Sequence, residues 1–121
     1  MLNDGLRGQS FTFGKHERIR TRQEISRVFE KGQKYSVKGM RLHVMRNDQP
    51  VNRAVFVTVR KYGNAVQRNR ARRVVSEGWR LYKPQLQAGF DVVCVVYPLE
   101  DTFAARQGQL AQLLRRSGLL H

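Results

Sequence analysis

The feature that most constrains the fold is a stretch without proline that runs from Asn64 to Lys83 and ends at Pro84. Its length predicts one long helix with Asn64 as N-cap. At about 100° per residue, apolar side chains fall on one arc and arginines on the opposite arc. The apolar arc holds Ala71, Val74, Val75, Gly78, Leu81 and Tyr82, and the polar arc holds Arg68, Asn69, Arg72, Arg73 and Arg80, with Arg70 near the boundary. The helix must pack its apolar side on another layer, which leaves its arginines for an external partner.

The rest of the chain predicts short strands and two further helices. The first helix starts at a capping box formed by Thr21 and Glu24, and it ends at Gly32. Alternation predicts a strand over 40–45 and a β-branched run predicts another over 54–59, so we expect these two strands to form an antiparallel hairpin. The other predicted elements are a short strand at 34–37, a strand at 89–97, and a closing helix capped by Asp101 or Thr102 that ends at 117–118.

This order, α-β-β-β-α-β-α, predicts an α+β fold built as a two-layer sandwich, with helices on a largely antiparallel sheet. The strands on either side of the long helix are placed to pair in parallel, and the general rule predicts a right-handed crossover between them. Residues 1–15 are rich in small and polar residues and show no period, which predicts a flexible N-terminal arm. Residues 16–121 are then one domain, since 121 residues suit a single core.

The charge balance requires a polyanionic partner. The chain has 23 Lys and Arg against 9 Asp and Glu, which gives a net charge of +14. The longest apolar run, 92–97, is far shorter than the about 20 residues of a membrane span, and the N-terminus lacks the apolar core of a signal peptide. We therefore expect a cytoplasmic protein whose polyanionic partner is nucleic acid and not a membrane. Its affinity for nucleic acid should fall steeply as the salt concentration rises.

The sequence offers little for chemistry by the protein alone. Cys94 is the only cysteine and lies in an apolar run, so it is predicted to be a small buried side chain and not a disulfide or metal ligand. The nine acids are scattered, and His16, His43 and His121 lie in unrelated contexts. A protein-only nuclease would need these groups in clusters. We expect no cofactor or metal bound by the protein alone and no catalytic residue in it.

Positive charge is most concentrated between Arg60 and Ser76. This segment contains six Lys or Arg residues and no acid. Arginine suits phosphate because its planar fork donates two parallel hydrogen bonds, and it also stacks on unpaired bases. An ordinary solvated helix would carry glutamates four residues from its arginines, but only Glu77 is present, near the far end. The segment therefore predicts RNA binding.

Within this segment, Arg60-Lys61, Gly63-Asn64-Ala65-Val66, Arg68-Asn69-Arg70 and Arg72-Arg73 follow one another in an ordered pattern. The pattern resembles the signature of the bacterial ribonuclease P protein family. The resemblance extends to 19–32, 89–96 and 103–116, so that it covers nearly everything after the arm. It implies an α+β fold with a left-handed crossover around the Arg-Asn-Arg helix, which we adopt in place of the right-handed expectation.

The resemblance also implies a function. Ribonuclease P is an endonuclease that removes the 5′ leader from precursor tRNA, and its RNA subunit holds the catalytic Mg²⁺ ions, while the protein is a non-catalytic subunit. The implied partners are ribonuclease P RNA and precursor tRNA, with no stable protein partner. The implied contacts to the RNA subunit are Arg60, Lys61, Asn64, Arg68, Asn69, Arg70, Arg72 and Arg73.

The family further implies a cleft for the single-stranded leader between the first helix and the sheet. Unpaired nucleotides are held by aromatic stacking along a basic groove. The residues expected there are Ile25, Phe29, Tyr35, Arg41 and His43. Phe29 as an ordinary core residue and His43 as a merely exposed imidazole remain alternatives.

Three positions depart from the family pattern. Ile25 stands where an aromatic residue is usual, Tyr97 where an arginine is common, and Val59 where a small polar residue precedes the basic pair. These departures concern leader contacts and not the central segment. The main alternative function is a ribosomal protein or general RNA chaperone, and a DNA-binding module is a weaker one. The ordered Gly-Asn-Ala-Val-x-Arg-Asn-Arg segment favours ribonuclease P.

Overall fold

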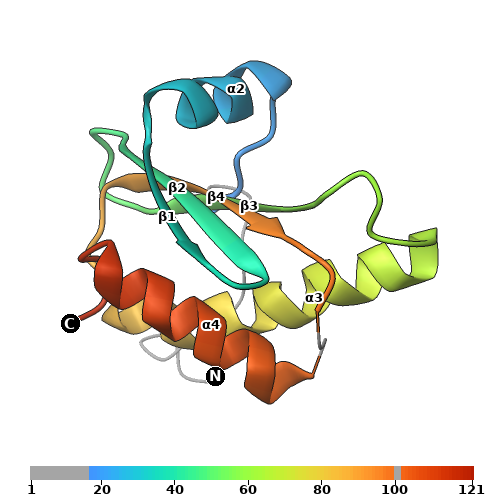
Figure 1. Cartoon of the computed structure of the whole chain (residues 1–121). Coiled ribbons are helices and arrows are strands. Elements are labelled where there is room, and N and C mark those ends of the chain that lie inside the picture. Colours follow the sequence, from blue (N-terminus) through green and yellow to red (C-terminus); the bar gives the residue numbers. More distant parts are fainter. Residues whose placement is uncertain (1–16, 100–101) are drawn as a thin grey trace, which may run out of the picture.

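The computed structural model describes residues 17–99 and 102–121, and the predicted flexible arm at 1–15 lies outside them. The elements follow in the predicted order, and two layers of helices enclose a single sheet (Figure 1). They are α2 (Arg22–Lys31), β1 (Gln33–Val37), β2 (Met40–Arg46), β3 (Arg53–Thr58), α3 (Ala65–Tyr82), the 3-10 turn η2 (Lys83–Gln85), β4 (Phe90–Val96) and α4 (Phe103–Arg116). The α+β prediction and the order α-β-β-β-α-β-α are confirmed.

The strand order in the sheet is β1-β2-β4-β3. The predicted hairpin between 40–45 and 54–59 is therefore wrong: β4 lies between β2 and β3, and the hairpin is formed by β1 and β2. The reason is the composition of β4, in which 91–96 are buried and almost entirely apolar on both faces. A strand of that kind belongs in the middle of a sheet, with a neighbour on each side.

The edge strand β3 pairs in parallel with β4, with Ala54 opposite Val92 and Thr58 opposite Val96. Between them the chain leaves the sheet, crosses beneath it as α3 and returns to the more central β4 (Figure 1). With the helix on this side and β4 inward of β3, the crossover is left-handed, as the family resemblance implied. The expected Asn64 cap is confirmed at the start of α3.

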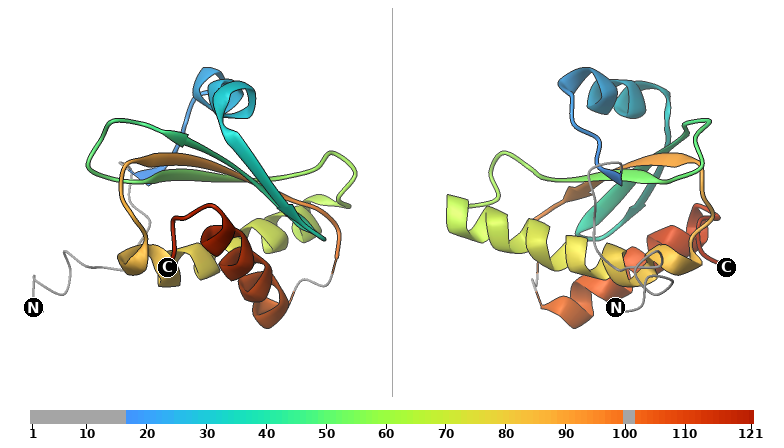
Figure 2. Two further views of the ribbon diagram at one scale, coloured as in Figure 1. Left: turned by 60° about the vertical axis from the view of Figure 1, so that its left-hand side comes forward. Right: turned by 180° about the vertical axis from the view of Figure 1, so that it is seen from behind.

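The main core lies between the sheet and the two helices α3 and α4, which cover the same face (Figure 2). Ala71, Val75 and Gly78 are buried as the helical arc predicted. Trp79 is buried as well, at 1% exposure, and was missing from that arc. It packs edge-to-face on Phe56 of β3, with ring centroids 6.0 Å apart. The long helix is therefore fixed to the sheet by a large aromatic contact near its C-terminal end.

On the opposite face, α2 covers only part of the sheet. Val28 is its one fully buried residue, and it packs with Ile19, Val93 and Val95 in a second, smaller cluster. The helix begins as predicted, because Thr21 accepts a hydrogen bond from the backbone of Glu24 in a capping box. So few apolar contacts leave the position of α2 dependent on its polar anchors.

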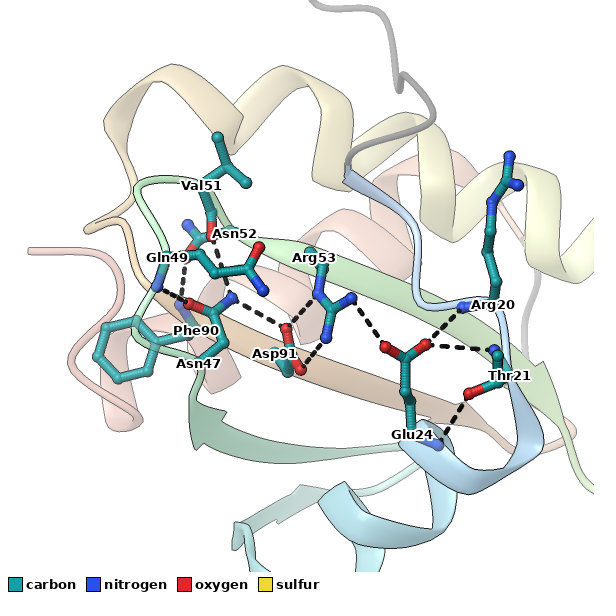
Figure 3. Close-up of polar contacts among 10 residues, drawn as sticks. All are labelled: Arg20, Thr21, Glu24, Asn47, Gln49, Val51, Asn52, Arg53, Phe90 and Asp91. Carbon is teal, nitrogen blue, oxygen red and sulfur yellow. Dashed lines mark hydrogen bonds and ion pairs between the residues drawn. The ribbon is translucent and has the colours of Figure 1, made fainter.

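The strongest of these anchors is a network centred on Arg53 (Figure 3). Its Nε and Nη2 donate to both oxygens of the buried Asp91, at 2.9 and 2.7 Å, and its Nη1 donates to Glu24 at 3.0 Å. Asn47 donates a further hydrogen bond to Asp91 at 2.9 Å. The bond from Arg53 lowers the pKa of Glu24, and the bond to Asp91 raises the pKa of Arg53. The network ties the first turn of α2 to β3 and β4.

We predict that Asp91→Ala lowers the free energy of unfolding by about 2 to 4 kcal/mol, because it leaves the half-buried Arg53 without its bidentate partner. A urea titration measures this change. The matched control is Glu77→Ala, which removes a surface ion pair with Arg80 on α3 and should cost less than about 0.5 kcal/mol. Equal losses in the two variants would contradict an anchoring role for the network.

Candidate nucleic-acid interface

The segment that leads into α3 has a fixed geometry. Gly63 adopts a φ of +133°, a conformation that L side chains rarely take, and a Cβ there would collide with the side chain of Gln67. Asn64 and Gln67 then exchange hydrogen bonds between side chain and backbone, at 2.9 and 3.0 Å. The Gly-Asn pair therefore sets the direction in which the first turn of α3 leaves the sheet. We call residues 59–64 the α3 entry loop.

Two of the arginines in the first half of α3 are held by the protein itself. Arg68 donates to the carbonyl of Gly63 at 2.5 Å, which ties the helix back to the α3 entry loop. Arg72 donates to Asn69 and, at 3.5 Å, to the hydroxyl of Thr58 at the end of β3. These contacts place two guanidinium groups in defined positions before any partner arrives.

Two others, Arg70 and Arg73, are exposed and form no hydrogen bond or ion pair with any residue between 17 and 99 or between 102 and 121. Arg60 and Lys61 of the α3 entry loop are exposed as well. Val66 beside them is 76% exposed, which is unusual for a large apolar side chain. All eight residues expected to contact the RNA subunit therefore lie on the α3 entry loop and the first half of α3, as one basic surface.

A second group of candidate residues meets on the face of the sheet beside α2. Phe29 packs edge-to-face on His43, with ring centroids 4.6 Å apart, and it remains 39% exposed, so it is not an ordinary core residue. Arg41 donates from Nε to Nε2 of His43 at 2.9 Å. Its guanidinium also lies over the ring of Tyr97, 5.6 Å from the centroid. We call Phe29, Arg41, His43 and Tyr97 the sheet-face cluster.

His43 is only 6% exposed, which excludes the alternative of a merely exposed imidazole. Burial lowers its pKa, and the nearby charges of Arg41 and Lys34 lower it further. The ring is therefore neutral at physiological pH, and its Nε2 acts as the acceptor for Arg41. The positive charge of the sheet-face cluster resides on Arg41.

Tyr35 does not join this cluster. It pairs with Leu42 across the β1–β2 hairpin, so its side chain points to the face that packs on α3 and α4, and its hydroxyl donates to Gln33 at 2.8 Å. The prediction that placed it with Arg41 and His43 took no account of the strand register, which puts those two on the other face. Ile25 does lie on the α2 side, half-buried against the small apolar cluster.

The structure gives Tyr97 a role that sequence reasoning missed. Tyr97 follows β4 directly, and the register of β2 with β4 places it next to Arg41 on the α2 side. The available signal was the alternation along β4, because Tyr97 shares its parity with Val93 and Val95. Tyr97, which stands where the family commonly has an arginine, is thus one of the two benzene-ring side chains of the cluster, beside Phe29.

The described residues offer little for chemistry of other kinds. Within the described ranges, no three His, Cys, Asp or Glu side chains lie close enough together to hold a metal ion. Cys94 is buried as predicted, and burial raises the pKa of its thiol to about 12. No helix among the described residues has the length and apolar character of a membrane span.

Comparison with known proteins gives a consistent result. The family model described as Ribonuclease P matches residues 13–118. The ribonuclease P protein component of Clostridium novyi is 35% identical over 109 residues, which cover 87% of this chain and 96% of that protein. The corresponding protein of Chloroflexus aggregans is 36% identical over 106 residues, which cover 85% of this chain and 78% of that protein.

Solved structures agree with the fold. The ribonuclease P protein from Thermotoga maritima superposes with a TM-score of 0.73 at 28% identity, and the match covers 83% of this chain and 96% of that one. The protein from Staphylococcus aureus superposes with a TM-score of 0.76 at 20% identity, over 87% and 98% of the two chains, which supports the fold alone. The match of the family model over most of the length shows that this chain belongs to the ribonuclease P protein family.

Proposed function

We propose that this chain is the protein subunit of a ribonuclease P ribonucleoprotein, in which the RNA subunit carries the catalytic Mg²⁺ ions and cleaves precursor tRNA. In this proposal the α3 entry loop and the first half of α3 bind the RNA subunit. The sheet-face cluster binds the 5′ leader. The protein then assists cleavage by holding the substrate beside the catalytic RNA and supplies no reacting group.

The observation that carries the proposal is that some arginines in the first half of α3 have hydrogen-bond partners within the protein and others do not. Arg68 and Arg72 are bound to the protein's own acceptors, whereas Arg70 and Arg73 have no hydrogen-bond or ion-pair partner in the described part of the chain and can offer their donors to another molecule. Preorganised donors lose less conformational freedom on binding, and free donors make the new charge-assisted bonds to phosphate. This combination is suited to a structured RNA with phosphates in fixed positions.

The sheet-face cluster has the composition expected for an unpaired strand. The half-exposed ring of Phe29 offers a surface on which a base can stack, and Arg41 supplies the charge for the backbone. The buried, neutral His43 supports both side chains from below. Such a site favours single-stranded nucleic acid without reading one particular base.

The two surfaces lie at the same end of the sheet. Strands β3 and β4 run in parallel, so the α3 entry loop leaves β3 where Tyr97 leaves β4. The amide of Val59 donates to the carbonyl of Val96 at 3.2 Å, which keeps these two strand ends together. A leader held by the sheet-face cluster would therefore lie close to RNA that is bound at α3.

Reconstitution tests the proposal directly. The chain is mixed with a bacterial ribonuclease P RNA at low Mg²⁺, and 5′ leader removal from precursor tRNA is scored. We expect cleavage well above that of the RNA alone, because the protein's positive charge replaces part of the cation requirement. Cleavage no faster than with RNA alone would refute the proposed function, and stimulation equal to that by an unrelated basic protein would point to a general RNA chaperone.

The free arginines give a sharper prediction. Arg70→Ala and Arg73→Ala should each weaken binding to ribonuclease P RNA about tenfold, because each removes charge-assisted hydrogen bonds to phosphate. Each should also reduce the slope of log affinity against log salt by about one. Filter-binding titrations at several salt concentrations measure both quantities.

The matched control for these variants is Arg115→Ala, which removes an exposed arginine from the last turn of α4. The Arg115→Ala variant has the same net charge as the α3 variants, so its RNA affinity shows how much the loss of one positive charge weakens binding regardless of position. If Arg115→Ala weakens binding as much as Arg70→Ala, the basic surface at α3 is not the site that contacts the RNA.

The leader site is tested by Phe29→Ala in the reconstituted ribonucleoprotein. This variant should lower the preference for precursor over mature tRNA by about tenfold, because a stacking surface for the leader is lost. Binding to the RNA subunit should be unchanged. The control is Phe103→Ala on α4, which removes a ring of nearly equal exposure, 37% against 39%, from outside the cluster. Equal losses of affinity for precursor and mature tRNA would mean that Phe29 has a structural role and does not contact the leader.

A further inference from the structure

Arg106 projects from α4 into the interior of the protein. It is 1% exposed and is among the largest fully buried side chains of the described residues. Its Nη1 donates to the carbonyl of Gly39 at 2.9 Å and to Gln109 at 3.0 Å. Its Nη2 donates to the hydroxyl of Tyr62 and to the carbonyl of Tyr97, both at 2.7 Å.

These contacts join parts of the chain that are distant in sequence. Gly39 belongs to the turn between β1 and β2, Tyr62 to the α3 entry loop, and Tyr97 to the end of β4. A buried guanidinium is costly unless its donors are satisfied, so each of these acceptors is drawn toward one point. An apolar residue at this position of α4 would fill the space without fixing the three segments relative to one another.

The turn at Gly39 is built closely around this point. Gly39 adopts a φ of +91°, and a Cβ there would approach a side-chain carbon of Leu99 to 2.6 Å. Its carbonyl accepts from the amide of Tyr97 at 3.0 Å as well as from Arg106. The backbone amide at the end of β4 and the guanidinium thus share one acceptor in the β1–β2 turn, which leaves little freedom for any of the three to move separately.

Two of the three segments lead into the surfaces described above. Tyr62 directly precedes the Gly63-Asn64 pair that sets the direction of α3. The ring of Tyr97 lies beneath Arg41 of the sheet-face cluster. Arg106 itself is buried between them and is not available to a partner.

We propose that Arg106 is a positioning residue that fixes the α3 entry loop relative to the Tyr97 end of the sheet. By holding both, it keeps the RNA-subunit surface and the leader surface in one geometry, a role that rests on the proposed function. It acts through Tyr62 and Tyr97 and touches no RNA. The direct consequence is that the entry loop loosens when the bond between Arg106 and Tyr62 is removed.

The test uses Tyr62→Phe, which removes the acceptor hydroxyl and keeps the buried ring. Amide hydrogen exchange of the free protein is read at Tyr62, Gln67 and Arg68, whose N–H groups donate within the entry loop and to its last residue, Asn64. We expect exchange there to rise about tenfold, the factor for one hydrogen bond to a charged group. Affinity for ribonuclease P RNA should fall by a similar factor.

Two controls separate positioning from general destabilisation. Tyr35→Phe removes a hydroxyl on the same face of the sheet whose one partner among residues 17–99 and 102–121 is Gln33, and it should change neither quantity. Val92→Ala destabilises the main core near the far end of β4 and should leave the exchange pattern of the entry loop and the RNA affinity as they are. Arg106→Met, if it folds, should exceed the effect of Tyr62→Phe in both measurements.

The outcomes are distinguishable. Unchanged exchange at the entry loop in Tyr62→Phe would overturn the proposal, whatever the RNA result. Faster exchange with unchanged RNA affinity would overturn the positioning role and leave Arg106 a residue of the fold. If the unsubstituted chain fails to bind ribonuclease P RNA, the proposed function fails, and the exchange rates, which are measured without RNA, still decide whether Arg106 holds the loop.

Discussion

The burial of β4 on both faces is the constraint on which the rest of the structure depends. An apolar strand of this kind needs a neighbour on each edge and a layer on each face. Strand β2 supplies one edge by antiparallel pairing, and β3 supplies the other in parallel. The parallel pair requires a crossover, and that crossover is α3, the helix with the arginine face. The position of the basic surface therefore follows from the composition of a strand that is itself buried on both faces.

Arginine has two separate uses in this chain. Arg53 and Arg106 are turned inward, where their planar groups satisfy several acceptors at once and join segments that apolar contacts alone would leave loosely held. Arg70 and Arg73 are exposed, and none of the residues that the structure describes accepts a hydrogen bond from their side chains. The net charge of the chain includes the inward-turned and the exposed arginines alike. Only the structure shows which arginines organise the protein and which are left for a polyanion.

The sequence allowed the element order, the capping residues and the apolar face of α3 to be predicted, because each depends on residues a few positions apart. The errors concern relations over longer distances. The expected hairpin failed because β4, far along the chain, displaced β3 from β2. Tyr35 was assigned to the wrong face because the pairing register of β1 decides its direction. The networks of Arg53 and Arg106 join residues up to 67 positions apart, and no local pattern indicates them.

The position of β1 at the edge of the sheet affects whether the free protein, without RNA, can self-associate. An unpaired strand edge is a template on which a second copy can add, and proteins commonly block such edges with charge. Here Lys34 lies on β1 and Lys38 follows it, both exposed, and Arg116 donates to the carbonyl of Ser36 at 2.8 Å. Two copies that approached through these edges would bring like charges together. The positive charge that attracts RNA thus also opposes self-association of the free protein.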